Sequence, residues 1–194
     1  MPDPSPSHEE FCSFLSAWGP TVLVAIFHNR KKRKPIEAFR YEVGSEEAAW
    51  AWASRLNGEK YGIYFHVGGV RAGFCGKATK ADITDVRWLH VDVDPRTGED
   101  LGVEQGRILD ALRGYSPPPT MIVFSGRGYQ GYWKLSGPAS HDVAERCNRA
   151  IEIALGGDCC HDVCRVMRCP GLINYPDERK AKGGAVPTMA RRVA

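Results

Sequence analysis

The sequence predicts an α+β fold, and three observations support this class. Over residues 87–173, strand-like and helix-like segments follow one another in the order β, α, β, β, α, β, which is the order of a split βαβ arrangement. The first 80 residues also mix strand-like runs with helical patterns. The composition, 43% apolar and 25% charged, is ordinary for globular proteins and excludes a mostly disordered chain, a collagen-like fibre and a disulfide miniprotein.

A helix and a hairpin are expected at the N-terminus. Ser7 and Glu10 have the spacing of a capping box, and the Gly-Pro pair at 19–20 is expected to end the helix. The apolar residues at helical spacing between them are Phe11, Phe14, Leu15 and Trp18. A β-branched run at 21–27 and an alternating segment at 36–43 predict two paired strands with a very basic tip.

Helices and strands alternate along the rest of the chain. Ser45 is expected to open a helix, because two glutamates follow in the first turn and Gly58 is a typical C-terminal glycine. The elements expected next are a strand at 61–68, an irregular segment at 70–84, a strand at 88–94, a helix at 103–115, a strand at 120–124, a turn at 125–130, a strand at 131–135 and a helix at 141–157. A short strand-like piece and a basic tail follow.

Length, charge and cysteine content restrict the possible classes of protein. The 194 residues fit one domain, and no apolar run approaches the ~18 residues of a membrane span, so no membrane partner is expected. The opening MPDPSPSHEE lacks the features of a secretory signal, so the seven cysteines are expected to be reduced thiols in a cytoplasmic protein. A net charge of +3 is too small to indicate nucleic-acid binding by itself.

The strongest chemical feature is an acidic pair in the strand at 88–94. Side chains alternate along a strand, so His90, Asp92 and Asp94 are expected on one face, with the intervening apolar residues in the core. Adjacent carboxylates repel each other unless a cation lies between them, and hard oxygen ligands suit Mg²⁺ or Mn²⁺. Two alternatives stay open: the strand ends here in a solvated turn, and His90 is a neutral histidine hydrogen-bonded beside Asp92.

The segment SGRGYQ at 125–130 is a glycine-containing turn between two strands. Glycines let backbone N–H groups approach phosphate oxygens, and Arg127 adds positive charge. No Gly-Lys-Ser/Thr is present and a strand follows, which excludes a P-loop and a Rossmann fingerprint. The alternative is an ordinary glycine-rich hairpin turn.

A third group of charged residues follows the helix at 141–157. Asp158 and Asp162 are both candidates for a third carboxylate, and Arg165 and Arg168 suit the bidentate binding of triphosphate or DNA phosphates. A surface ion-pair network is the alternative interpretation. The nearby residues that raise a zinc hypothesis are Cys159, Cys160, His161, Cys164 and Cys169. No CxxC pair is present and adjacent cysteines rarely chelate one ion well, so zinc is not expected.

Taken together, HVDVDP, SGRGYQGYW and GGDCCHDVCRVMRCPGLIN resemble the archaeo-eukaryotic primase superfamily, and within it the RepB-type primases and primase–polymerases of plasmids and phages. The family's order is an acidic DxD strand, a strand with a Ser-x-His-type motif and a third aspartate after a small or hydrophobic residue. The resemblance covers roughly residues 60–175, and GKATKADI before the first motif also fits this branch. Its specificity comes from three motifs in the same order at suitable spacings.

The resemblance implies a single catalytic domain over 1–194, in which a primase core with an RRM-like antiparallel sheet joins an N-terminal α/β portion. It divides the chain at about 1–80, about 81–180 and a basic tail at 181–194. The implied activity is template-directed nucleotidyl transfer from NTP or dNTP, with two divalent metals, Mg²⁺ or Mn²⁺. The implied partners are a single-stranded DNA template and nucleoside triphosphates, and a helicase or further replication domain is left open.

Carried over by position, the resemblance makes Asp92 and Asp94 catalytic metal ligands, with Asp158 as the third because it follows a small residue, and Asp162 as its rival. His90 is a possible addition to the site. The residues implied in nucleotide binding are Ser125, Arg127, Gln130, Arg165, Arg168 and Asn174. Gln130 departs from the family, because many members have a histidine there that contacts nucleotide phosphates. Glutamine donates a hydrogen bond but carries no charge, and Arg127 is the candidate that compensates.

Five consecutive cations form the basic tip of the first hairpin: Arg30, Lys31, Lys32, Arg33 and Lys34. Such runs are usually solvated loops, but in a polymerase they would contact template phosphates and make binding salt-dependent. Two other functions therefore stay open beside the primase–polymerase. One is a non-catalytic DNA-binding module of a replication initiator, and the other is a metal-dependent nuclease.

Overall fold

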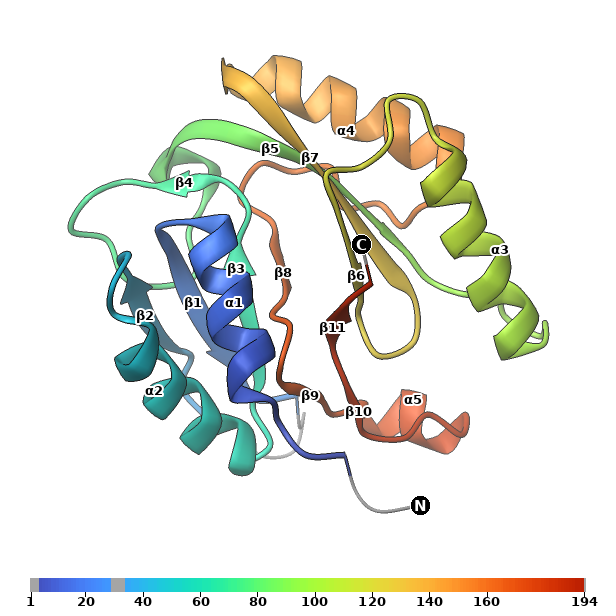
Figure 1. The fold of residues 1–194 in the computed structure, drawn as a ribbon, viewed down its shortest axis with the longest axis horizontal. Coiled ribbons are helices and arrows are strands. Elements are labelled where there is room, and N and C mark those ends of the chain that lie inside the picture. Colours follow the sequence, from blue (N-terminus) through green and yellow to red (C-terminus); the bar gives the residue numbers. More distant parts are fainter. Residues whose placement is uncertain (1–3, 29–33, 194) are drawn as a thin grey trace.

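Two antiparallel sheets form the framework of the chain, which the computed structural model describes over residues 4–28 and 34–193 (Figure 1). The first sheet has the order β2-β1-β3-β8, made of Glu37–Tyr41, Thr21–Ile26, Gly62–His66 and Val166–Arg168. The second has the order β11-β6-β7-β5-β4, made of Arg191–Arg192, Met121–Phe124, Tyr129–Ala139, Ile83–Val93 and Gly69–Val70. A separate ladder pairs β9 (Ile173–Asn174) with β10 (Thr188–Met189).

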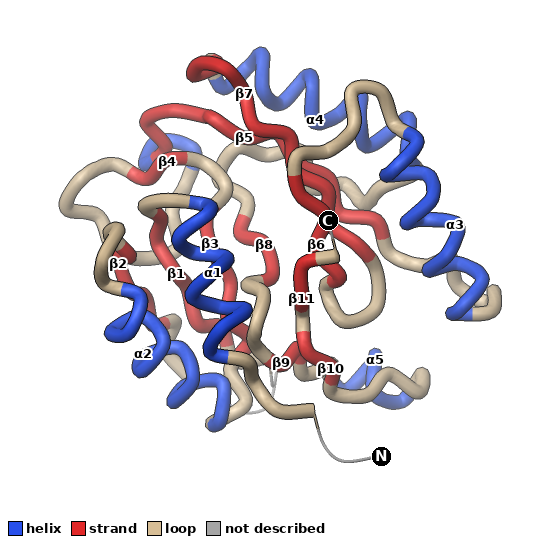
Figure 2. The backbone as a smooth tube through the Cα atoms, viewed as in Figure 1, coloured by secondary structure: helices blue, strands red, loops and turns tan. Residues whose placement is uncertain are grey.

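Helices cover each sheet on one side (Figure 2). The helices α1 (His8–Trp18) and α2 (Glu46–Gly58) pack on the first sheet, and α3 (Leu101–Gly114) and α4 (His141–Leu155) pack on the second. The short helix α5 (Glu178–Lys182) and a 3₁₀ turn at Lys80–Asp82 lie in connecting segments. Among the described residues, every helix is too short or too polar to cross a bilayer.

Side-chain caps start α1, α3 and α4, whereas Ser45, which is expected to open α2, makes no side-chain cap hydrogen bond. The Oγ of Ser7 accepts a hydrogen bond from the backbone N–H of Glu10 at 3.3 Å. The carboxylate of Glu10, however, accepts from the backbone N–H of Arg192 at 2.6 Å, so this half of the expected capping box ties α1 to β11 instead. Asp100 and Ser140 cap α3 and α4 by accepting from the N–H three residues further on.

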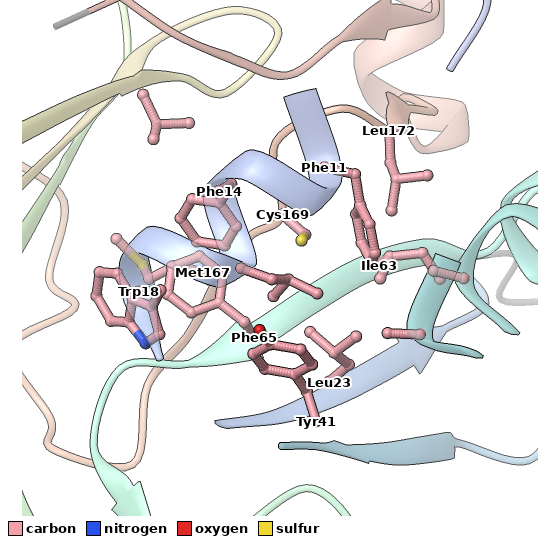
Figure 3. Packing of buried hydrophobic residues seen from close by; sticks show 14 of the residues in the cluster. Phe11, Phe14, Trp18, Leu23, Tyr41, Ile63, Phe65, Met167, Cys169 and Leu172 are labelled. Carbon is pink, nitrogen blue, oxygen red and sulfur yellow. The ribbon is translucent and has the colours of Figure 1, made fainter. Parts of the chain in front are cut away.

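Aromatic rings connect the two sheets through α1, and Figure 3 shows the part of this cluster that includes Phe14, Trp18 and Phe65. The indole of Trp18 stacks on that of Trp88 in β5, with the ring centres 4.4 Å apart and the planes at 12°. The centre of the same ring lies 4.7 Å from the ring centre of Phe65 in β3 and 5.3 Å from that of Tyr132 in β7. Burial of these large rings fixes how the sheets lie relative to each other, because offset and edge contacts of this kind add to the hydrophobic free energy.

The predicted N-terminal hairpin is confirmed, because β1 pairs antiparallel with β2. Of its basic tip, Arg30, Lys31, Lys32 and Arg33 lie outside the described residues. Lys34 is described, and its ammonium lies 4.5 Å from the ring centre of Phe27 and 3.7 Å from the carboxylate of Glu59. The structure therefore places this last cation against its own hairpin and the end of α2.

One strand of the predicted βαββαβ order joins a different sheet. The elements β5, α3, β6, β7, α4 and β8 do occur in that order, but β8 pairs with β3 in the first sheet, where Met167 lies opposite Phe65. The edge beside β6 is taken by β11. Met167 and Cys169 belong to the apolar cluster around α1. Burial of these side chains stabilises the pairing of β8 with the N-terminal sheet.

Replacing Trp18 with alanine should remove the ring that joins the sheets and leave a cavity among Phe65, Trp88 and Tyr132. We expect the free energy of unfolding to fall by about 3–5 kcal/mol, measured by urea denaturation. The exposed Ala17→Ser change on the same helix is the control and should stay within about 0.5 kcal/mol of the parent. A loss for Trp18→Ala no larger than that of the control would contradict the bridging role.

Candidate active site

A cavity of about 500 Å³ is lined by residues from both sheets. It brings together most of the residues that the sequence singled out: Asp92, Asp94, Ser125, Arg127, Gln130, Asp162, Arg165, Arg168 and Asn174. The open face of the first sheet contributes Tyr64 and Arg168, whereas the second sheet contributes Asp92 and Gln130. The second sheet thus places a carboxyl group on the cavity wall, and the first sheet places a guanidinium group there.

Asp92 lies near the end of β5, opposite Gln130 of β7. One oxygen of its carboxyl group is buried without a hydrogen-bond partner. Burial, then the charges of Asp94 and Asp158, raise the pKa of Asp92 to about 7. The negative charge of its ionised form is therefore poorly stabilised by the protein. A bound cation would stabilise such a carboxylate more than one that already has partners.

Asp158 is held beside Asp92 by the backbone. Its N–H donates to the carbonyl oxygen of Asp92 at 2.8 Å. The approach requires a glycine before it, since a Cβ on Gly157 would lie 2.6 Å from the Cγ2 of Val91 and 2.9 Å from the carbonyl oxygen of Asp92. Burial, then the charge of Asp94, raise the pKa of Asp158 as well. The three carboxyl groups thus act on one another.

Asp162, the rival third carboxylate, lines the cavity, whereas Asp158 does not. Its carboxylate lies 3.6 Å from the guanidinium of Arg165, so its charge already has a partner. The charges that raise the pKa of Asp92 are those of Asp94 and Asp158. Two residues that share a cation must lie close enough for their charges to interact. The charge of Asp158 raises the pKa of Asp92, so this interaction favours Asp158 over Asp162 as the partner of Asp92, although Asp162 lines the cavity.

His90 shares the face of Asp92, as the strand pattern predicts, but it is sealed from the cavity and only 2% exposed. Its Nε2–H donates to the carbonyl oxygen of Cys160 at 2.8 Å, and Nδ1 accepts from the amide of Asn148 at 3.3 Å. Burial lowers the pKa of His90 to about 4. The neutral, hydrogen-bonded alternative therefore describes His90, and it does not face the cavity.

Gln130 is 3% exposed and is held between two polar groups. The hydroxyl of Tyr132 donates to its Oε1 at 2.9 Å, and the Gln130 side chain opposes in part the effect of burial on the pKa of Asp92. Burial raises the pKa of Tyr132 well above its ordinary value, so the hydroxyl keeps its proton and stays a donor. Gln130 thus supports Asp92 at the place where the family resemblance implies a phosphate-binding histidine.

The turn between β6 and β7 packs directly against the acidic strand. A Cβ on Gly128 would lie 2.2 Å from the carbonyl oxygen of Val93 and 2.8 Å from a carboxylate oxygen of Asp94, so only glycine fits. From β9, the amide of Asn174 donates to the carbonyl oxygen of Ser125 at 2.7 Å. Asn174 and Ser125 therefore help to fix this turn, in addition to lining the cavity.

Three arginines line the cavity, and their side chains differ in the contacts they make. The guanidinium of Arg168 lies 4.2 Å from the ring centre of Tyr64, and one of its nitrogens is buried without a hydrogen-bond partner. Arg165 pairs with Asp162, whereas no ion-pair partner is found for half-buried Arg127 within the described chain. The unpaired guanidinium nitrogen of Arg168 and the positive charge of Arg127 suit an anionic ligand.

Several cavity residues escaped the sequence reasoning. Lys180 of α5 places its ammonium 3.4 Å from a carboxylate oxygen of Asp94, and His28, Tyr64 and Lys77 line other parts of the wall. No spacing rule connects Lys180 with Asp94, since 86 residues separate them. The sequence indicated Lys77 only indirectly, because it lies in the segment GKATKADI that contributes to the family resemblance.

The acidic residues fit a divalent cation chemically. They offer hard oxygen ligands, Asp92 has an unpaired buried oxygen, and the ammonium of Lys180 already lies beside Asp94. Across the described ranges, their oxygens are not among the ligand groups whose atoms all lie within 4.8 Å of one another. A cation would therefore draw the carboxylates closer together than they lie here.

The raised pKa of Asp92 predicts a pH-dependent stability. The folded chain binds this proton more tightly than the unfolded chain, so ionisation destabilises the fold as pH rises from about 4 through about 7. With a chelator present, Asp92→Asn should raise the melting temperature by a few degrees at pH 8, and by less at pH 5. The exposed Asp110→Asn change is the control. An equal shift of the Asp92 variant at both pH values would contradict this account.

Comparison with known proteins identifies solved structures with a similar fold. No family model and no curated protein matches the sequence. The AEP domain of the primase–polymerase of cyanophage S-2L aligns with a TM-score of 0.68 at 18% identity, covering 98% of this chain and 91% of that one. A crystal structure of the primase RepB' aligns with a TM-score of 0.69 at 12% identity, covering 96% of this chain and 56% of that one.

A further similar structure is the catalytic domain of RepB' in complex with initiator DNA, with a TM-score of 0.66 at 14% identity over 96% of this chain and 84% of that one. All three alignments extend over nearly the whole of this chain and therefore include both sheets. The mixed α/β architecture with antiparallel sheets is the one that the sequence resemblance implies. The chain has the fold of an archaeo-eukaryotic primase-type domain.

Proposed function

We propose that this chain is a primase–polymerase that transfers nucleotides from NTP or dNTP to a growing strand on single-stranded DNA, in the replication of a plasmid, phage or mobile element. The observation that carries the proposal is the acidic group of Asp92, Asp94 and Asp158 beside a cavity that is also lined by Arg127, Arg165 and Arg168. The fold shared with primase and primase–polymerase domains supports it. The whole described chain would serve as one catalytic domain.

The carboxyl groups of Asp92, Asp94 and Asp158 would hold Mg²⁺ or Mn²⁺. Such ions, when bound, activate an attacking hydroxyl and neutralise a leaving pyrophosphate. The contribution of the protein is to keep the three carboxyl groups close together despite their repulsion, through the hydrogen bond from Asp158 to the Asp92 backbone and the support of Gln130. Lys180 would leave Asp94 when a metal arrives.

The guanidinium groups of Arg168, Arg165 and Arg127 would bind the triphosphate. The stacking of Arg168 on Tyr64 orients its planar fork before any ligand arrives, so less conformational entropy is lost on binding. Arg127 lies in the turn that Gly128 presses against Asp94, which places a cation near the acidic group. We assign Arg127 the charge that Gln130 lacks.

The DNA partner is proposed on two grounds. The catalytic domain of RepB' has been solved in complex with initiator DNA, and the fold of the present chain is similar. The basic run from Arg30 to Lys34 adds a cationic segment that would contact template phosphates in a salt-dependent manner. Its first four residues lie outside the described ranges, so this role is proposed from the sequence.

The experiment compares Asp158→Asn with Asp162→Asn in a primer synthesis and extension assay with labelled nucleotides and Mn²⁺ or Mg²⁺. We expect Asp158→Asn to lower the rate by at least about a hundredfold, because a ligand is lost, and Asp162→Asn to lower it by less than about tenfold. Cooperative thermal unfolding of both variants would show that they are folded. Full activity of Asp158→Asn would overturn its assignment, and a silent parent enzyme would overturn the proposed function.

The same assay separates the two other functions that the sequence leaves open. Binding of single-stranded DNA without nucleotide incorporation would identify a non-catalytic initiator module. Cleavage of DNA in the absence of nucleotides, lost in the Asp158→Asn variant, would identify a metal-dependent nuclease that uses the same carboxylates.

A further inference from the structure

A second group of metal-binding side chains lies next to the segment that carries Asp158. Glu152 comes from the end of α4, and Cys159 and His161 come from the loop that follows. Their ligand atoms all lie within 4.8 Å of one another. The Oε2 of Glu152 is 3.1 Å from the Nδ1 of His161, and the Sγ of Cys159 is 3.9 Å from the same nitrogen.

These separations match those of ligands that share one zinc ion. Zinc bonds of about 2.0–2.2 Å to nitrogen or oxygen and about 2.3 Å to sulfur, at tetrahedral angles, place N and O about 3.4 Å apart and S and N about 3.6 Å apart. The observed distances of 3.1 Å and 3.9 Å each differ from these by about 0.3 Å. Small side-chain rotations would therefore complete the geometry without movement of the backbone.

The backbone of this loop is already fixed by buried groups. The N–H of Cys160 donates to the Oε2 of Glu152 at 3.2 Å, which orients the carboxylate. The carbonyl oxygen of His161 accepts from the amide of Asn148 at 3.1 Å, and that of Cys160 accepts from His90 at 2.8 Å. Hydrogen bonds of this kind commonly orient the ligands of metal sites.

The sequence spacing argued against zinc because adjacent cysteines rarely bind one ion together. The fold removes this objection, because Cys160 is buried in the core whereas Cys159 is exposed on the loop. The third ligand, Glu152, comes from the preceding helix and belongs to no cysteine pattern. A thiolate, an imidazole and a carboxylate form a donor set for zinc, unlike the all-oxygen group of Asp92, Asp94 and Asp158.

A similar group at the N-terminus offers an internal comparison. His8, Cys12 and Glu47 also have ligand atoms within 4.8 Å of one another. The side chains of His8 and Glu47 are 46% and 81% exposed, against 24% for His161 and 13% for Glu152. Ordering exposed side chains costs conformational entropy, so the group beside Asp158 is the better prepared of the two.

We propose that Glu152, Cys159 and His161 form a zinc site with one open coordination position. The ion ties the loop after α4 to the helix and fastens the segment that presents Asp158 to Asp92. The site is separate from the proposed catalytic metal site and does not depend on the proposed function.

Metal content and a cobalt spectrum test the site on the full chain. Protein purified without chelator should contain one zinc per chain, and Co²⁺ added to the apoprotein should give a thiolate-to-cobalt charge-transfer band, which the all-oxygen group cannot produce. Cys159→Ser should abolish the band, and Glu152→Gln should weaken Zn²⁺ binding by at least about tenfold. Cys12→Ser, which alters the N-terminal group, should leave band and affinity unchanged.

Two results would overturn the proposal. One is substoichiometric zinc together with no thiolate band in the parent protein. The other is a band that persists in Cys159→Ser but disappears in Cys12→Ser. Because Glu152→Gln changes only the charge of one side chain, it keeps the test decisive if a cysteine variant fails to fold. Nucleotide incorporation is not measured, so the outcome is independent of the primase assay.

Discussion

The hydrogen bond from the N–H of Asp158 to the carbonyl oxygen of Asp92 is the contact on which the candidate site depends. It is available because β4 pairs with β5 only at Ile83 and Asp85, so in the described part of the chain the rest of that edge of β5 has no neighbouring strand. The loop after α4 supplies the N–H of Asp158 to this edge, and the side chain of Asn148, within α4, accepts from the N–H of His90 there. An unpaired strand edge is thereby converted into a support for a third carboxylate.

This arrangement brings like charges together, and the fold compensates for their repulsion from several directions. The polar side chain of Gln130 lies opposite Asp92 on the neighbouring strand, and Lys180 lies beside Asp94 from α5. The remaining strain is visible as the raised pKa values of Asp92 and Asp158. A perturbed carboxyl group that lines a cavity, as that of Asp92 does, is typical of sites that bind cations or perform catalysis.

Much of this could be predicted from the sequence, because local patterns govern the elements that carry the motifs. Strand alternation placed Asp92 and Asp94 on one face, and a Gly-Gly pair marked the end of α4 before Asp158. Long-range pairing has no local signal: the choice of β8 for the first sheet, the position of Lys180 and the recruitment of Glu152 are decided by tertiary contacts. The role of Gln130 was also hidden, since its partners, Tyr132 and Asp92, become clear only in the folded sheet.

The most direct test of the central claim is a crystal structure of the chain with Mn²⁺ and a non-hydrolysable nucleoside triphosphate, in which the anomalous signal locates manganese. The account predicts manganese bound by Asp92, Asp94 and Asp158, with the triphosphate against Arg168 and Arg165. Manganese bound to Asp162 instead of Asp158, or a triphosphate bound away from these carboxylates, would contradict it.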